Sequence, residues 1–136
     1  MPGYSGTPLA KKLGFTDGMI VWQAGLPDSV RAAIDDQADI AWIDDAMDEP
    51  AAAHIFATER ADMERLLGDL RQSMAQNGFV WMSWPKKASK VPTDITEDVI
   101  REVALPMGLV DIKVCAVDEI WSGLKLVIRK ELRQLR

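Results

Sequence analysis

The stretch Phe79-Val80-Trp81-Met82-Ser83-Trp84-Pro85-Lys86-Lys87 decides the fold, because in it an apolar strand runs directly into a basic loop. A helix capped at Thr93-Asp94 follows, and two further strands meet at the turn Asp118-Glu119-Ile120-Trp121-Ser122-Gly123. Strand, loop, helix, strand, tight turn and strand, in this order, form the second half of an open α/β sheet. The turn between the last two strands is so short that we expect them to be antiparallel neighbours.

Hydrophobic pattern and capping residues divide the whole chain into alternating strands and helices. Strands are predicted at 19–24, 39–43, 53–57, 79–84, 111–117 and 124–129. Helices are predicted after Thr7 as N-cap with Pro8 next, from Pro27 to Asp36, from the cap Thr58 to Asn77-Gly78, and after Asp94. The nearly unbroken apolar run at 19–24 is typical of a central strand, whereas acidic neighbours favour a sheet edge for 39–43. Asp94 and Glu97 have the spacing of a capping box.

Length, charge and apolar content exclude several classes of protein. With 136 residues, 48% of them hydrophobic, residues 1–136 are expected to form a single domain. The net charge of −5 argues against a nucleic-acid partner, which needs a broad basic face. No apolar run approaches the ~20 residues of a membrane span, and the N-terminus lacks a signal core, so a cytoplasmic protein is expected. The single Cys115 lies in an apolar run and is expected to be a buried structural thiol.

Five blocks of sequence resemble one uncharacterised bacterial family, the domain of unknown function numbered three thousand and fifty-two. The blocks are Tyr4-Ser5-Gly6-Thr7-Pro8-Leu9, Trp84-Pro85-Lys86-Lys87, Val91-Pro92-Thr93-Asp94, Gly108-Leu109-Val110-Asp111 and Trp121-Ser122-Gly123-Leu124-Lys125. This resemblance extends over nearly the whole chain. It implies no activity, because the family has none assigned.

The layout of residues 53–130 is similar to the C-terminal half of a Rossmann-like S-adenosylmethionine-dependent methyltransferase. Residues 19–43 would then form a shortened first half that lacks one strand and its helices. The resemblance implies an open, mostly parallel α/β sheet of about six strands. Their order would be 2-1-3-4-6-5, with the last strand antiparallel to its neighbours.

The turn Gln23-Ala24-Gly25-Leu26-Pro27 follows the first strand, where those methyltransferases carry a glycine-rich turn beside the cofactor. Only Gly25 matches, and bulky Leu26 and Pro27 crowd the close backbone approach that glycine permits. We therefore expect no cofactor and no catalytic residues, and interpret the protein as a non-catalytic small-molecule-binding or regulatory module. The alternatives are an atypical methyltransferase and an interaction subunit that docks a partner through its acidic segment.

A small anion site is predicted where lysines follow the fourth strand. Lys86, Lys87 and Lys90 should lie at the carboxyl edge of the sheet, close to Thr93 and the amides that begin the next helix. Trp84 and Trp121, at strand ends, are candidates to wall a planar ligand. The alternatives are a solvated loop that keeps an acidic protein soluble and tryptophans that pack in the core.

Two other features have simpler interpretations. The segment Asp35–Glu49 holds seven acidic residues, and Asp44, Asp45, Asp48 and Glu49 would bind a hard cation only if folded inward. No EF-hand spacing is present, so a solvated face or a docking surface for a basic partner is favoured over a metal site. His54 has no partner at ligand spacing and is expected to be a core residue. The expected partners are a small anion, another protein or a second copy, and neither nucleic acid nor membrane.

Overall fold

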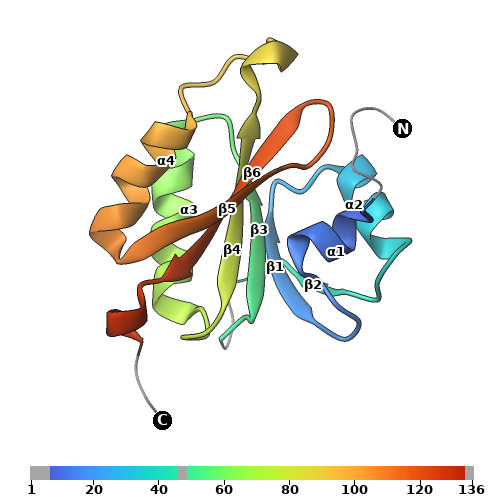
Figure 1. Cartoon of the computed structure of the whole chain (residues 1–136), viewed down its shortest axis with the longest axis horizontal. Helices are drawn as coiled ribbons and strands as arrows, with labels where there is room; N and C mark the ends of the chain where they lie inside the picture. The colour runs from blue at the N-terminus through green and yellow to red at the C-terminus, as the bar shows by residue number, and fades with distance from the viewer. Residues whose placement is uncertain (1–6, 46–48, 134–136) are drawn as a thin grey trace.

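The computed structural model describes residues 7–45 and 49–133, which include a single six-stranded mixed sheet (Figure 1). Its strands are β1 (Ile20–Ala24), β2 (Ala41–Ile43), β3 (Ala52–Phe56), β4 (Phe79–Pro85), β5 (Leu109–Ala116) and β6 (Trp121–Ile128). They lie in the order β2-β1-β3-β4-β6-β5. The pairs among β2, β1, β3 and β4 are parallel, and β6 is antiparallel to both β4 and β5. The predicted strand order and the antiparallel last strand are confirmed.

Two pairs of helices cover the two faces of this sheet (Figure 1). One face carries α3 (Arg60–Ser73) and α4 (Glu97–Ala104), and the other carries α1 (Leu9–Leu13) and α2 (Asp28–Asp35). Short 3₁₀ turns follow β4 as η1 (Lys87–Ser89), α4 as η2 (Leu105–Met107) and β6 as η3 (Lys130–Leu132). None of the helices in the described ranges is both long and apolar enough to cross a membrane.

The core beneath α3 and α4 is formed by aliphatic and methionine side chains from both layers. Met63, Leu67 and Leu70 of α3 are fully buried and are spaced to lie on one side of that helix. They pack against strand residues such as Ile55 and Met82. Burial of each such side chain contributes about 1.5–3 kcal/mol, so this face is the principal source of stability for the two helices.

The core beneath α1 and α2 depends on aromatic side chains. Trp81 is fully buried, and its Nε1 donates a hydrogen bond to the backbone oxygen of Leu13 at 2.7 Å. Phe15 stacks on Phe79, with ring centroids 6.0 Å apart. A five-residue helix such as α1 is unstable in isolation. Its place on the sheet therefore depends on these long-range contacts.

The predicted helix caps are wrong by one or two residues, and the capping box is wrong. Pro8 and Glu59 occupy the N-cap positions of α1 and α3, and neither provides a side-chain cap. At α4 the cap is Thr96, whose Oγ1 accepts a hydrogen bond from the backbone nitrogen of Val99 at 3.2 Å. Asp94 lies before this cap and is bonded elsewhere in the fold.

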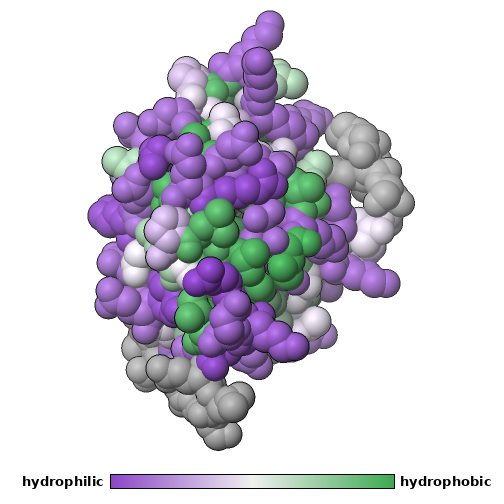
Figure 2. Space-filling model, turned by 60° about the vertical axis from the view of Figure 1, so that its left-hand side comes forward, coloured by the Kyte–Doolittle hydropathy of each residue, from purple (hydrophilic) through white to green (hydrophobic). Residues whose placement is uncertain are grey.

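The expectation that Cys115 is buried is also wrong, because β5 is an edge strand. Cys115 is only half-buried, and Ile112 and Val114 of the same strand are 57% and 53% exposed. An apolar run in the sequence therefore does not imply burial at a sheet edge. Figure 2 shows one face of the molecule on which apolar side chains gather within a mostly hydrophilic surface.

Candidate functional site

The switch point at the carboxyl ends of β1 and β3 is the first candidate site. In the sheet β1 lies between β2 and β3. The chain passes from β1 to β2 in one direction across the sheet and from β3 to β4 in the other, so it leaves β1 and β3 in opposite directions. Ligands of open α/β sheets bind at such a switch point. Here the switch point is bordered by the turn Gln23–Pro27 on one side and by residues 56–58 on the other.

Gly25 brings the backbone of the turn against the end of β3. Its φ is +68°, a left-handed conformation, and a Cβ atom at this position would lie 2.6 Å from the carbonyl oxygen of Phe56. The glycine therefore allows the turn to approach β3 closely. That is a structural role, and it brings the turn to the place where a ligand would otherwise meet the end of β3.

The side chain of Gln23 is hydrogen-bonded to two polar groups near the carboxyl end of β1. Its Oε1 accepts a hydrogen bond from the backbone nitrogen of Leu26 at 3.1 Å, and its Nε2 donates to Asp44 Oδ1 at 2.6 Å. Asp44 directly follows β2, so Gln23 bridges the ends of two neighbouring strands. A ligand that used this amide and this carboxylate would have to displace Gln23 from both.

The lysine loop after β4 is placed where the sequence indicates. Lys86 is half-buried, and its backbone nitrogen donates to the carbonyl of Ile120 at 2.7 Å, which fixes the loop to the β5–β6 turn. Lys87 and Lys90 are exposed, and Lys90 has a positive φ of 62°. The three ammonium groups thus belong to one short surface segment at the carboxyl edge of the sheet.

Thr93 and Asp94 connect this loop to α3. Thr93 Oγ1 donates to the carbonyl of Thr58 at 2.6 Å and accepts from the nitrogen of Ile95 at 3.0 Å. Asp94 Oδ1 accepts from the nitrogen of Arg60 at 2.7 Å, so it caps α3 and not α4. Both side chains therefore already have partners within the protein.

The two candidate tryptophans lie on opposite faces of the sheet. Trp84 is only 9% exposed and packs in the core beneath α3 and α4. Trp121 is half-buried on the other face and meets Phe56 edge-on, with ring centroids 5.1 Å apart. The two rings are therefore not placed to enclose one ligand together.

His54 is fully buried on the α1–α2 face. Its Nε2 is 3.0 Å from Ser83 Oγ, and its ring lies 4.2 Å from that of Phe56. Burial lowers the pKa of His54 to about 3, so the ring is neutral at physiological pH. Its Nδ1 has no hydrogen-bond partner among the described residues. A neutral and fully buried imidazole is the core residue that the sequence predicts.

The acidic segment shows no converging carboxylates in the part of it that is described. Asp44 bonds to Gln23, and Asp35 Oδ1 accepts from Trp42 Nε1 at 2.8 Å. Asp48 lies outside the described residues. Across residues 7–45 and 49–133 as a whole, no three His, Cys, Asp or Glu side chains form a group able to hold a metal ion.

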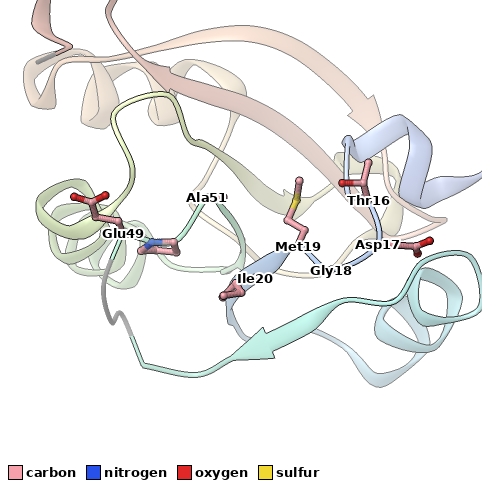
Figure 3. A pocket seen from close by; sticks show the side chains of 8 residues that line it. Thr16, Asp17, Gly18, Met19, Ile20, Glu49 and Ala51 are labelled. Atoms are coloured by element: carbon pink, nitrogen blue, oxygen red, sulfur yellow. The ribbon is translucent and has the colours of Figure 1, made fainter. Parts of the chain in front are cut away.

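An open hollow of about 400 Å³ lies at the opposite, amino edge of the sheet (Figure 3). It is lined by Thr16, Asp17, Gly18, Met19, Ile20, Glu49, Pro50 and Ala51. Figure 3 shows Asp17 and Glu49 at opposite ends, with Met19 and Ile20 between them. Asp17 Oδ1 also accepts from the nitrogen of Asp39 at 2.8 Å. The polar groups of this hollow do not converge on a common ligand.

Sequence reasoning missed a second lysine group. Lys12 of α1 and Lys113 of β5 lie near the half-buried Cys115, and Lys125 of β6 is the register partner of Lys113. More than 100 positions separate Lys12 from the two strand lysines, so no local motif brings these residues together. Strand register was the only signal that could have paired Lys113 with Lys125.

Solved structures with a similar fold include several methyltransferases and a complex with SAM. Magnesium protoporphyrin IX methyltransferase (ChlM) from Synechocystis PCC 6803 with bound SAH has a TM-score of 0.57 and 11% identity, over 90% of this chain and 80% of that one. The glycopeptide N-methyltransferase MtfA complexed with sinefungin has a TM-score of 0.53 and 12% identity, over 88% and 90%. LepI in complex with SAM gives 0.55 and 10%, over 89% of this chain but only 39% of LepI. The fold is therefore of the methyltransferase-like α/β class.

The chain itself belongs to the family described as "Protein of unknown function (DUF3052)", whose model matches residues 10–130. Among curated proteins, none matches this sequence significantly. The family resemblance stated from the sequence blocks is confirmed. Identities of 10–12% to the solved structures establish a shared fold and nothing about a shared activity.

Proposed function

We propose that this protein is a non-catalytic binding or regulatory module that retains a methyltransferase-like fold without its cofactor site. The observation that supports this best is the position of Gln23. Its side chain is bonded both to the backbone nitrogen of Leu26 and to the carboxylate of Asp44. One side chain of the protein is thus hydrogen-bonded to both the Leu26 amide and the Asp44 carboxylate at the switch point.

Displacing Gln23 would be costly for an incoming ligand. Each lost hydrogen bond costs about 0.5–1.5 kcal/mol, and more where a carboxylate is involved. The turn leaves no space in compensation, because Gly25 already lies against the Phe56 carbonyl. Only a ligand that replaced both bonds and also moved the turn would bind there. Binding of a nucleoside cofactor is therefore disfavoured at the switch point.

We propose that the ligand is a small anion held by Lys86, Lys87 and Lys90. Two of these lysines are exposed, and the backbone of the third is fixed to Ile120. Because exposed ammonium groups attract an anion only weakly, the binding would be sensitive to salt. Thr93 and Trp84 would support the loop from behind, since both are engaged within the protein. Trp121 would contribute only from the opposite face.

The second candidate function is an atypical S-adenosylmethionine-dependent methyltransferase. It is favoured by the fold neighbours solved with SAM, SAH or sinefungin. A third role, docking of a basic protein partner through residues 35–49, draws support from the exposed Asp35 and Asp36. The lone Cys115 fits a reducing compartment, and we propose the bacterial cytoplasm as the place of action.

Thermal denaturation with S-adenosylmethionine separates the first two candidates. A ligand at 100 times its Kd adds about 2.7 kcal/mol to the free energy of unfolding, a clear rise in Tm. We expect no rise for the natural protein. Gln23→Ala frees the Leu26 amide and Asp44, and Gln72→Ala, at an exposed position of α3, is the matched control. Micromolar binding by the natural protein that Asp44→Asn abolishes would establish the methyltransferase-like site instead.

The anion proposal has its own test. Titration of the full chain with inorganic phosphate at low ionic strength should shift the amide resonances of residues 86–90. The triple change of Lys86, Lys87 and Lys90 to glutamine should remove those shifts. Unchanged binding of every detectable anion by the triple variant would show that this loop is only a solubilising surface.

A further inference from the structure

We propose that a second site, on the β5–β6 hairpin, binds a small oxyanion between Lys113 and Lys125. The two lysines are direct partners in the antiparallel register of β5 and β6, so their side chains leave the same face of the sheet side by side. Like charges directly opposite each other destabilise a strand pair. A chain with 21 acidic residues has nonetheless placed two cations together here.

No carboxylate of the described chain neutralises this pair. Within residues 7–45 and 49–133, neither Lys113 nor Lys125 has an acidic partner within 4.0 Å. The acidic residues of the same hairpin are directed elsewhere. Asp111 bonds to Arg101 of α4 at 3.2 Å, on the other face, and Asp118 Oδ1 accepts from the nitrogens of Ile120 and Trp121. The positive charge of the pair is therefore uncompensated by these groups.

Phe79, Lys12 and Cys115 lie close to the lysine pair. The Nζ of Lys125 lies 4.3 Å from the ring centroid of Phe79, and the Nζ of Lys12 in α1 donates a hydrogen bond to the carbonyl of Ala116 at 3.1 Å. Cys115 is half-buried opposite Gly123, which has no side chain. Burial, together with Lys113, lowers the pKa of Lys125, as expected for an ammonium group without a counter-ion.

An oxyanion would resolve these features together. Phosphate or carboxylate oxygens accept charge-assisted hydrogen bonds from two ammonium groups at once, and the attraction of each group to the bound anion offsets the repulsion between them. The aromatic ring of Phe79 and the Cys115 thiol would border the site without competing for the anion. This inference does not depend on the proposed function, because the site lies on different strands from the Lys86–Lys90 loop.

Phosphate-dependent stability of the full chain tests the site. The urea midpoint is measured in chloride and in phosphate at equal ionic strength for the natural protein, Lys113→Gln, Lys125→Gln and Lys125→Arg. Phosphate should raise the midpoint of the natural protein and of Lys125→Arg. Each glutamine variant should bind phosphate at least about tenfold more weakly, because it loses a hydrogen bond to a charged group. Succinate in place of phosphate tells whether the site prefers a phosphate or a carboxylate.

The two lysine groups are distinguished by their own variants. The triple glutamine variant at Lys86, Lys87 and Lys90 should keep the full phosphate response of the hairpin, as should Lys130→Gln, an exposed lysine outside both groups. In this triple variant, the amide shifts that remain on phosphate addition should centre on Lys113 and Gly123. The proposal is overturned if phosphate shifts the midpoints of all variants equally, if it shifts none, or if only the triple variant loses the response.

Discussion

Asp94 Oδ1 accepts a hydrogen bond from the backbone nitrogen of Arg60 at 2.7 Å, although the two residues are 34 positions apart in the chain. The loop that leads into α4 therefore caps α3. Free amides at a helix start need such a partner, and within α3 no side chain provides one. The first turns of α3 and the loop before α4 are stabilised as one unit.

Asp94→Ala is expected to lower the free energy of unfolding by about 1 kcal/mol, the usual value of an N-cap. Thr96→Ala should cost a similar amount, since Thr96 caps α4. Urea denaturation of both single variants and of the double variant is the measurement. The two side chains share no hydrogen-bond partner, so the two losses should add to within about 0.5 kcal/mol. A strongly non-additive pair would indicate that both residues cap the same helix.

Gly25→Ala is expected to destabilise the protein by about 2 kcal/mol or more. The left-handed conformation alone costs a non-glycine residue roughly 1–2 kcal/mol, and the new Cβ would lie 2.6 Å from a backbone oxygen that cannot move freely. Gly68→Ala is the matched control. It lies inside α3 with no atom within 4 Å of a Cβ, so it should stabilise by roughly 0.5–1 kcal/mol. Equal effects of the two variants on the urea midpoint would contradict this account of Gly25.

Trp81→Phe is expected to cost about 1–3 kcal/mol, because the carbonyl of Leu13 then loses its buried donor. Amide hydrogen exchange should become faster in α1 before it does in α3. Trp42→Phe removes a comparable indole bond, to the exposed Asp35, and should cost less. If the two tryptophan variants are equally stable, the bond to Leu13 is not what holds α1.

His54 should make stability fall as the pH is lowered. Its folded pKa of about 3 lies below the unfolded value of 6.5, so the stability that the neutral ring allows is complete above pH 6.5. Between pH 6.5 and about 3, His54 binds a proton in the unfolded chain but not in the folded one. The free energy of unfolding therefore drops by up to about 1.4 kcal/mol per pH unit as the pH is lowered. His54→Gln should remove this part of the slope. Parallel pH profiles for the two proteins would show that His54 becomes protonated while buried.

The strands and helices were accessible from local features of the sequence, whereas the order of the strands followed from the resemblance of the layout to a methyltransferase. Apolar runs such as 19–24 mark central strands, and the short turn near Asp118 requires β5 and β6 to be antiparallel neighbours. The loop lysines were likewise located correctly, since they directly follow β4. Their role as a ligand site stays a prediction.

The helix caps were not accessible, although Asp94 and Glu97 have the spacing of a capping box. A capping-box spacing describes only hydrogen-bond partners that lie a few residues away in the chain. In the fold, Asp94 meets Arg60, and Glu97 Oε2 accepts from Arg101 Nη2 at 2.8 Å. The competing partners come from other elements or from the next turn of the helix, and local spacing cannot rank them.

The amino-acid sequence by itself thus determined the elements, because hydrophobic period and turn length act between near neighbours, and its resemblance to known families indicated their order in the sheet and the family. Only the tertiary structure decided which side chains meet. Strict alternation would place Asp111 and Lys113 on one face, but an irregularity between them in β5 sends Asp111 to Arg101 and Lys113 to Lys125. A single extra residue in a strand exchanges its faces, and no local pattern in the sequence records that exchange.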